Sequence, residues 1–259
     1  MKINSPQINL MYKACTKASK ILIRDYGEIE KLQVSEKGPG DFVTASDKRV
    51  EKILISELEK SEYTFLTEET GLIEGKHKNK RWIIDPIDGT FNFLNGLPHF
   101  CISVGYEENG EIVSGIIFDP IKNEMFFAHK GSGAYLNNSR IRVSNKSNFQ
   151  RACLVTGGPK SVSKIKESIL DEYKKVSMKT QAHIRKSGSA ALDLAYVAAG
   201  RYDGYWQREI NYWDIAAGII LVKESGGFIE NLKEEGFNKE KVDIVASNSK
   251  IHKELINIL

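Results

Sequence analysis

Cysteine is scarce in this sequence of 259 residues. Its three cysteines, Cys15, Cys101 and Cys153, lie far apart, and no CxxC pair occurs. An odd number of isolated thiols argues against a disulfide framework and predicts reduced, mostly buried side chains in a cytoplasmic protein. The N-terminal residues have neither a long apolar core nor a small-residue cleavage site, so we expect no secretory signal.

Long apolar runs and an excess of charge of one sign are missing as well. The longest stretch without Asp, Glu, Lys or Arg, residues 89–106, is interrupted by asparagine, glycine and proline, so we expect no membrane span. The 37 basic and 34 acidic residues leave a net charge of +3, which is too small to indicate a nucleic-acid-binding surface.

Several catalytic signatures are also absent. The five histidines form neither an HExxH motif nor a close pair of the kind that binds zinc. The sequence has no GxSxG elbow, no Walker A loop and no GxGxxG fingerprint. Ser187 and Ser189 flank Gly188 before an alanine-rich helix. Because no general base is evident beside them, we expect a capping or packing role rather than a nucleophile.

The pattern of apolar residues changes near residue 150. Before it, spacings of three and four predict a helix that ends near Gly27 and a second that starts after Ser46, with a turn-rich loop at 38–44 between them. Apolar runs divided by turn residues predict antiparallel hairpins over about 99–143. After residue 150, strands and helices alternate. We therefore expect an α/β protein with an α+β subdomain at 1–150 and an α/β subdomain at 151–259.

Beyond the first two helices, the sequence predicts nine strands and four further helices. The strands are Tyr63–Thr67, Arg81–Asp85, Phe100–Tyr106, Ile112–Phe118, Glu124–His129, Cys153–Thr156, Tyr202–Gln207, Phe228–Asn231 and Val242–Ser247. The further helices are Ser161–Lys175, Ala190–Ala199, Trp213–Glu224 and one that begins at Ser249.

The stretch Trp82–Thr90 carries the clearest chemical signal. An apolar strand ends in Asp85, Pro86 keeps Asp85 extended, and Asp88 follows three residues later. Two carboxylates so close together suit a hard cation such as Mg²⁺. The Gly89 backbone, next to a helix start, favours an anion such as phosphate. A turn with a helix-capping aspartate accounts for the same residues equally well.

Two further acids stand at the ends of predicted elements. Glu68 follows a strand, and Asp214 stands where a helix begins. Taken alone, Glu68 fits an exposed loop acid and Asp214 fits an N-cap. If both converge with Asp85 and Asp88, the repulsion of four negative charges raises their pKa values. Cations would neutralise that charge and allow a phosphate ester to bind, with an affinity for metal that falls at acid pH.

With these residues, the sequence resembles the inositol monophosphatase family of Mg²⁺-dependent, lithium-sensitive phosphatases, and especially its bacterial branch of extragenic suppressor proteins. The resemblance begins at about residue 5 and continues to residue 259. Its motifs are Asp41–Asp47, Thr67–Glu69, Trp82–Thr90, Gly188–Gly200 and Trp213–Gly218. DPIDGT followed by WDIAAG is highly specific. The resemblance implies a five-layer αβαβα sandwich of the sugar phosphatase type.

The same resemblance implies two Mg²⁺ ions and a third, weaker one near Glu68. Glu68, Asp85 and the carbonyl of Ile87 would hold the first ion. Asp85 would bridge to the second, which Asp88 and Asp214 complete. Two adjacent cations activate water and stabilise both the attacking and the leaving oxygen of a phosphoryl transfer.

The resemblance also assigns groups around the phosphate. A water oriented by Glu68 and Thr90 would attack the phosphorus in line, and Asp47 would support Thr90 by a hydrogen bond. Backbone N–H groups of Gly89 and Thr90 would bind phosphate oxygens. Lys37 aligns with a basic residue of the family's metal loop, although a solvated loop lysine fits this position equally well.

The alcohol side of the site departs from the family. Asp88 and the backbone at Ala190 align with groups that contact inositol hydroxyls. Seven residues before Asp214, where the family has a glutamate, this sequence has Gln207, which loses a charge-assisted bond to a hydroxyl. Glu209 is two strand positions away, roughly 7 Å, and cannot be assumed to replace it. Phe91 stands where a small polar residue is usual. The metal ligands are unaffected, but a preference for polyols is in question.

We therefore expect a Mg²⁺-dependent phosphomonoesterase that acts on inositol monophosphate or a related polyol or sugar phosphate. One alternative is a phosphatase for another substrate, such as fructose 1,6-bisphosphate or a nucleotide 3′-phosphate. Another is an interaction protein that binds RNA polymerase or antitermination factors, as the bacterial branch implies. The resemblance further implies a homodimer and sensitivity to lithium.

Overall fold

The computed structural model describes residues 5–28, 34–38, 41–158, 167–233, 236–237 and 241–259. Its helices are α1 Pro6–Tyr26, α2 Ala45–Leu58, α3 Thr90–Leu94, α4 Glu167–Thr180, α5 Ala190–Ala198, α6 Tyr212–Glu224 and α7 His252–Ile258. The strands up to residue 141 are β1 Val34–Gly38, β2 Asp41–Thr44, β3 Tyr63–Thr67, β4 Gly71–Ile73, β5 His77–Asp88, β6 Cys101–Glu108, β7 Glu111–Asp119, β8 Glu124–His129, β9 Gly133–Leu136 and β10 Ser139–Ile141. The later strands are β11 Cys153–Thr156, β12 His183–Arg185, β13 Gly204–Asn211, β14 Phe228–Asn231 and β15 Lys241–Ser247.

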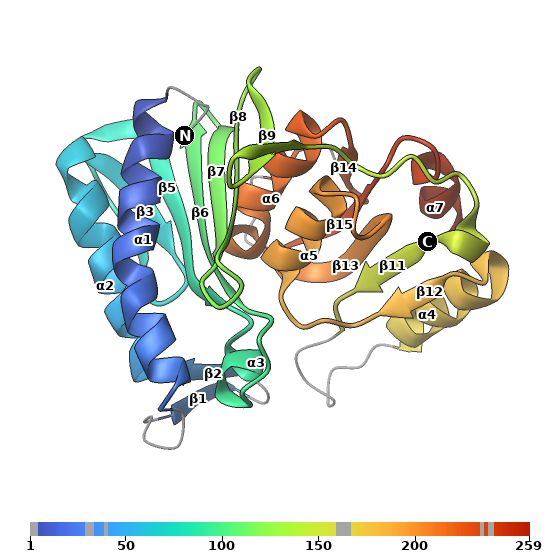
Figure 1. Cartoon of the computed structure of the whole chain (residues 1–259), viewed down its shortest axis with the longest axis horizontal. Coiled ribbons are helices and arrows are strands. Elements are labelled where there is room, and N and C mark those ends of the chain that lie inside the picture. The colour runs from blue at the N-terminus through green and yellow to red at the C-terminus, as the bar shows by residue number, and fades with distance from the viewer. Residues whose placement is uncertain (1–4, 29–33, 39–40, 159–166, 234–235, 238–240) are drawn as a thin grey trace.

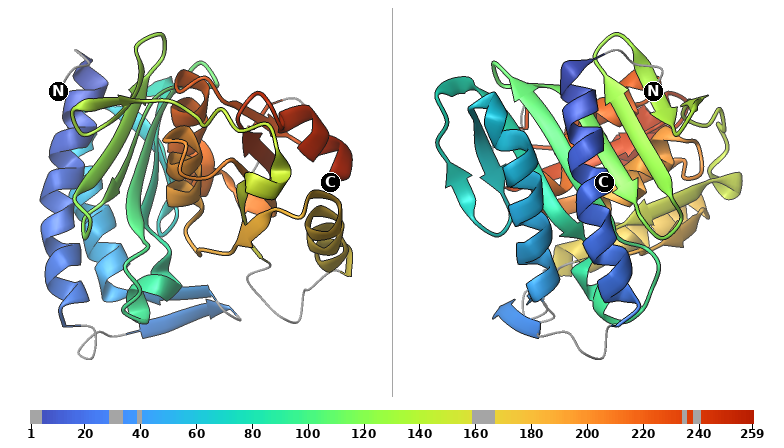
Figure 2. Two further views of the ribbon diagram at one scale, coloured as in Figure 1. Left: turned by 45° about the vertical axis from the view of Figure 1, so that its right-hand side comes forward. Right: turned by 60° about the vertical axis from the view of Figure 1, so that its left-hand side comes forward.

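Helices and sheets alternate in five layers (Figure 1). Helices α1 and α2 cover the outer face of an eight-stranded sheet, where α1 contacts β7 and α2 contacts β5. Helices α5 and α6 lie between this sheet and a five-stranded sheet, and α4 and α7 form the opposite outer layer (Figure 2). The α/β class and the five-layer αβαβα arrangement expected from the sequence are confirmed.

The two sheets differ in the direction of their strands. The larger has the order β10-β9-β8-β7-β6-β5-β3-β4 and is antiparallel except for the parallel pair β3 and β5. The smaller has the order β12-β11-β13-β15-β14, with β12, β11 and β13 parallel. Because parallel strands deliver their carboxyl ends to the same edge of a sheet, the ends of β3 and β5 meet, as do those of β11, β12 and β13.

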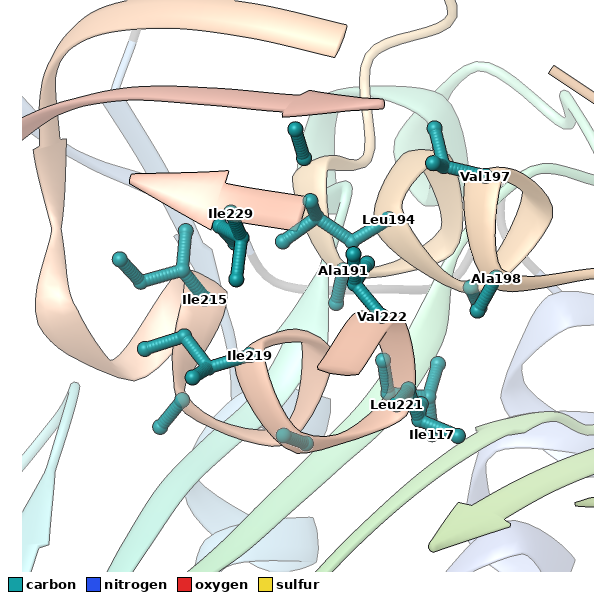
Figure 3. Packing of buried hydrophobic residues seen from close by; sticks show 14 of the residues in the cluster. Ile117, Ala191, Leu194, Val197, Ala198, Ile215, Ile219, Leu221, Val222 and Ile229 are labelled. Atoms are coloured by element: carbon teal, nitrogen blue, oxygen red, sulfur yellow. The ribbon is translucent and has the colours of Figure 1, made fainter. Parts of the chain in front are cut away.

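Helix α6 is apolar almost all round because it is buried between two sheets. Its side chains Ile215, Ile219 and Val222 pack among residues of α5, such as Leu194, in one continuous core (Figure 3). Close approach to the larger sheet depends on Gly115 of β7, where an added Cβ would lie 2.8 Å from the Cα of Ala217. The position of this helix is therefore set by contact of backbone with backbone.

Most predicted elements are confirmed, and four strands have the predicted bounds: Tyr63–Thr67, Glu124–His129, Cys153–Thr156 and Phe228–Asn231. The terminal helix begins at His252 rather than at Ser249. The predicted helix 161–175 is observed as Glu167–Thr180, and residues 161–166 lie outside the described part of the chain. In the described ranges, no helix combines the length and the apolar character that crossing a membrane requires.

The predicted loop at 38–44 is a correction. Asp41–Thr44 forms β2, which pairs antiparallel with β1, while residues 39–40 lie outside the described part. The aromatic and β-branched residues of this segment favour a strand once a partner strand is available. Helix α2 then begins at Ala45, two residues earlier than predicted, because Thr44 and Asp47 form a capping box. The short strand β12 was not predicted, and it is held in place by its pairing with β11.

Candidate active site

Three buried aspartates from distant parts of the sequence meet between the two sheets. Asp85 and Asp88 lie near the carboxyl end of β5, and Asp214 lies in the first turn of α6. A carboxylate oxygen from each lies within 4.8 Å of the others, an arrangement that could hold a metal ion. Their exposed fractions are 1%, 8% and 6%, in the order of the sequence. Because buried like charges destabilise one another, this arrangement calls for a cation.

The local backbone turns Asp85 and Asp88 toward the same place. Between them β5 has one residue more than the facing strand β6, because Asp85 pairs with Ser103 while Asp88 pairs with Cys101. Such a bulge re-aims a side chain that would otherwise alternate with its neighbours. The N–H of Ile87 donates to Asp85 Oδ1 at 3.0 Å and fixes that carboxylate.

The electrostatics around Asp85 favour the binding of a cation. Burial raises the pKa of Asp85 well above its usual range, and the negative charges of Glu68, Asp88 and Asp214 raise it further. Glu68 follows β3, is half-buried, and donates its backbone N–H to the carbonyl of Ile84 at 3.1 Å. Its charge acts on Asp85, so the structure brings the fourth predicted acid to the same site.

Asp88 is held by the start of α5. Ser189 Oγ and the N–H of Ala191 each donate to Asp88 Oδ2 at 2.6 Å. The alternative in which Asp88 caps the following helix is wrong, since the N-cap of α3 is Gly89 and no side chain caps it. Ser189 also caps α5, as expected, by accepting the N–H of Leu192 at 3.4 Å. Its contact with Asp88 joins positions 101 residues apart, which no local sequence pattern predicts.

Asp214 does not cap its helix. The N-cap of α6 is Asn211, whose Nδ2 donates to Asp214 Oδ2 at 3.4 Å. The alternative that treats Asp214 as an N-cap is therefore wrong, because the helix begins at Tyr212, earlier than predicted. Inside the first turn, the Asp214 side chain joins the carboxylates of β5 instead.

Thr90 and Asp47 lie beside the three aspartates. Thr90 Oγ1 donates to the carbonyl of Ile87 at 2.9 Å and lies 3.3 Å from Asp47 Oδ1. Asp47 is fully buried, and burial raises its pKa to about 6 despite hydrogen bonds from Thr44. The Thr90–Asp47 contact expected from the resemblance is present.

Gly89 connects the acids to α3. Its φ is +96°, in the left-handed region that favours glycine, and an added Cβ would lie 3.0 Å from the carbonyl oxygen of His99. Phe91, the departure next to it, lies in α3 with 58% of its surface exposed. Lys37 lies in β1, but its side chain is outside the described part of the structure.

The alcohol side of the candidate site is formed by α5 and β13. Ala190 is the first residue of α5 and is half-buried. The Tyr205 hydroxyl donates to Gln207 Oε1 at 2.5 Å, a contact that sequence reasoning did not predict. Glu209 does not continue a regular strand from Gln207. The strand bulges between Gln207 and Ile210, and Glu209 has a φ of 53°.

Comparison with known proteins agrees with this geometry. Residues 4–259 match the Inositol monophosphatase family. The inositol-1-monophosphatase of Rhizobium meliloti (strain 1021) is 44% identical over 98% of this chain and 96% of its own length. The Nus factor SuhB of Haemophilus influenzae is 38% identical over 98% of this chain and 95% of its own length.

A solved structure supports the same family. The crystal structure of the extragenic suppressor protein suhB from Bartonella henselae superposes with a TM-score of 0.92 at 44% sequence identity, and covers 98% of both chains. The sequence and the fold therefore match the same family over nearly the whole chain. The chain belongs to the inositol monophosphatase family.

Proposed function

We propose that this chain is a Mg²⁺-dependent phosphomonoesterase that hydrolyses inositol monophosphate or a related polyol or sugar phosphate. The observation that carries the proposal is the cluster of Asp85, Asp88 and Asp214, with oxygens within 4.8 Å of one another. A buried, anionic and all-oxygen donor set suits a hard cation. The name of the Rhizobium meliloti relative, inositol-1-monophosphatase, supports the substrate class.

The acids divide between two ions in this proposal. Glu68, Asp85 and the carbonyl of Ile87 would hold one ion. Asp85, Asp88 and Asp214 would hold the other, and a third, weaker ion would bind near Glu68. When bound, Mg²⁺ lowers the pKa of water and offsets the charge that develops on the attacking and leaving oxygens.

The chain itself supplies the groups that orient the reaction. Thr90 is anchored by the Ile87 carbonyl and Asp47, and with Glu68 it orients the attacking water. The N–H groups of Gly89 and Thr90 bind phosphate oxygens. Water adds to phosphorus as the P–O ester bond breaks, and the alcohol leaves with one proton of the water.

Asp88, Ala190 and Gln207 border the alcohol in this arrangement. The structure supports this place for them, since Asp88 accepts two hydrogen bonds from the start of α5 and Gln207 lies on β13. Phosphate release from inositol 1-phosphate should therefore depend on residues of both sheets.

The test is phosphate release from inositol 1-phosphate with Mg²⁺ and with a chelator. We expect activity in Mg²⁺ only, reduced at least about 100-fold in Asp88→Asn, because a metal ligand is lost. Asp171→Asn, at an exposed position of α4, is the matched control and should retain activity. A folded wild-type protein that is inert toward a panel of phosphomonoesters would rule the proposal out.

A different substrate is the nearest alternative. Relative kcat/KM values for inositol 1-phosphate, fructose 1,6-bisphosphate and a nucleotide 3′-phosphate rank the candidates, with Mg²⁺ held constant. The same metal site serves each of these esters, so only the alcohol side of the pocket decides the order.

A role in transcription is the second candidate function, favoured by the name Nus factor SuhB of the Haemophilus influenzae relative. We propose that the chain can bind RNA polymerase or an antitermination factor through a surface separate from the acid cluster. Purified polymerase should be retained equally by the wild type and by Asp88→Asn. If neither protein retains the polymerase, the result counts against this role.

The remaining proposals concern assembly, location and inhibition. We propose a homodimer, for which light scattering should give about twice the chain mass of 29.1 kDa. A mass near that of one chain contradicts it. We also propose a cytoplasmic location, tested by fractionation of cells, and inhibition of phosphate release by lithium.

A further inference from the structure

The rim of the site on the five-stranded sheet carries hydrogen-bond donors. Gly157 and Gly158 follow β11, Lys186 follows β12, and Gln207 lies on β13, so the three parallel strands bring them to one edge. A Cβ added at Gly157 would lie 1.7 Å from Gln207 Oε1, and one added at Gly158 would lie 2.4 Å from Lys186 Nζ. The two side chains therefore pack side by side on the glycine pair.

This rim adjoins the acid cluster. Lys186 precedes Ser189 by three residues, a span of at most roughly 11 Å, and Ser189 Oγ donates to Asp88. On the other side, Gln207 accepts from Tyr205, whose pKa is raised by burial and further by the negative charges of Asp193, Asp88 and Asp214. Both residues therefore lie at the edge of the sheet that is next to the acid cluster.

Tyr205 determines which end of the Gln207 amide is available. Tyr205 is fully buried, so its hydroxyl proton requires an acceptor, and within the described ranges that acceptor is Gln207 Oε1. The amide nitrogen then remains for a ligand, and it donates only. A carboxylate at this position would instead leave an acceptor oxygen, which suits a hydroxyl.

Lys186 adds a positive charge to the same rim. Its side chain is exposed and has no ion-pair partner in the part of the chain that the structure describes. An ammonium group and an amide N–H₂ both donate, and neither can accept from a hydroxyl. Together they match an anion better than a neutral polyol.

We propose that Lys186 and Gln207 form a subsite for an anionic group, a phosphate or a carboxylate, on the alcohol part of the substrate. The preferred substrate is then a phosphomonoester whose alcohol carries a second negative charge. This inference rests on the proposed phosphatase function and deepens it.

The test compares esters that differ in one group. Fructose 1,6-bisphosphate against fructose 1-phosphate examines a second phosphate, and 3-phosphoglycerate against glycerol 3-phosphate examines a carboxylate. With saturating Mg²⁺, we expect kcat/KM to be roughly tenfold higher for the charged member of at least one pair. The pair that responds identifies whether phosphate or carboxylate is bound.

Three variants assign the effect to the rim. Lys186→Met should remove the preference by raising KM for the charged ester while the neutral ester keeps its kcat/KM. Gln207→Glu should reverse it, because Tyr205 still donates but an acceptor now faces the ligand. Lys253→Met is the matched control. It removes the same charge from α7. That helix follows the end of β15, which pairs with Gly204 at the start of β13, so it lies at the edge of the sheet opposite the rim.

The outcomes separate this inference from the proposed function. An enzyme that releases phosphate from both members of each pair at equal rates, or faster from the neutral members, overturns the subsite and leaves the phosphatase intact. A preference that survives Lys186→Met and Gln207→Glu also overturns it. A protein inert toward all four esters and inositol 1-phosphate fails as a phosphatase in the first place.

Discussion

At the residue scale, Asp85 shows why this site requires a cation. Its carboxylate is 1% exposed, and Glu68, Asp88 and Asp214 all raise its pKa in addition to burial. In the described ranges, the largest electrostatic effects on it come from these three acids. An ion with two positive charges would reverse each of these effects, because it neutralises the neighbours and favours ionised Asp85.

Without bound metal, this environment should lower the free energy of unfolding by an amount that depends on pH. The pKa of Asp85 is raised in the folded state above its unfolded value of about 3.9. As pH rises above about 4, the unfolded state ionises first and is favoured, by about 1.4 kcal/mol for each unit of difference in pKa. Asp85→Asn lacks this penalty and keeps an acceptor for the N–H of Ile87.

In a chelator, Asp85→Asn should therefore have a larger free energy of unfolding than the wild type at pH 7 and nearly the same value near pH 4. Urea unfolding at both pH values measures it. Asp171→Asn serves as the control at an exposed site. If the free energy of unfolding differs between Asp85→Asn and the wild type by the same amount at both pH values, the prediction is contradicted.

At the element scale, the turn between β5 and α3 combines a positive φ with groups proposed to bind phosphate. Gly89 and Gly226 both have positive φ, +96° and +85°, but only Gly89 is surrounded, with His99 O 3.0 Å from an added Cβ. Alanine at Gly226 should destabilise the protein by about 1 kcal/mol through φ alone.

Gly89→Ala should lower stability by more than Gly226→Ala, because the new Cβ also presses on the His99 carbonyl and on Phe100. The displaced backbone carries Thr90, so phosphate release should fall at least about tenfold. Thermal unfolding and the phosphatase assay measure both effects. Equal stability losses and unchanged activity in the two variants would show that the turn does not position Thr90.

Helix α6 provides a second test at this scale. An added Cβ at Gly115 would lie 2.8 Å from Ala217 Cα, whereas one at Gly105 would lie 3.1 Å from the Cβ of Ala216. Because backbone yields less easily than a side chain, Gly115→Ala should cost about 1–3 kcal/mol and more than Gly105→Ala. It should also weaken Mg²⁺ binding, measured by calorimetry, since α6 carries Asp214. A Gly115→Ala protein with native stability and affinity would show that α6 can shift freely.

At the scale of the whole molecule, the acid cluster joins parts that fold around different sheets. Asp85 and Asp88 come from the larger sheet, and Asp214 comes from a helix that contacts both sheets. The division into subdomains 1–150 and 151–259 stays a prediction. Their interface is an extended apolar core around α5 and α6 (Figure 3).

Mg²⁺ should therefore stabilise the whole molecule. At 100 times its Kd a ligand adds about 2.7 kcal/mol to the free energy of unfolding, which raises Tm by about 5–10 °C for a chain of this size. Asp214→Asn should lose most of this increase, while Asp171→Asn should keep it. Calorimetric scans with and without Mg²⁺ measure it, and an equal increase in all three proteins would place the ion elsewhere.

Local chemistry made much of this protein predictable. Four strands and the start of α5 follow from patterns within a few residues, as does the pairing of Asp85 and Asp88 near one strand end. The family follows from DPIDGT and WDIAAG, whose residues are contiguous. These features depend on neighbours in sequence, so periodicity, turn residues and motifs are sufficient to predict them.

Only the tertiary structure decided where each acidic side chain lies. Whether Asp214 caps its helix or joins Asp85 depends on the packing of α6 between two sheets, and Asp88 turns toward Ser189 because a bulge in β5 re-aims it. The orientation of Gln207 likewise depends on a buried tyrosine. Contacts across a hundred residues arise from burial and close packing, which no local pattern contains.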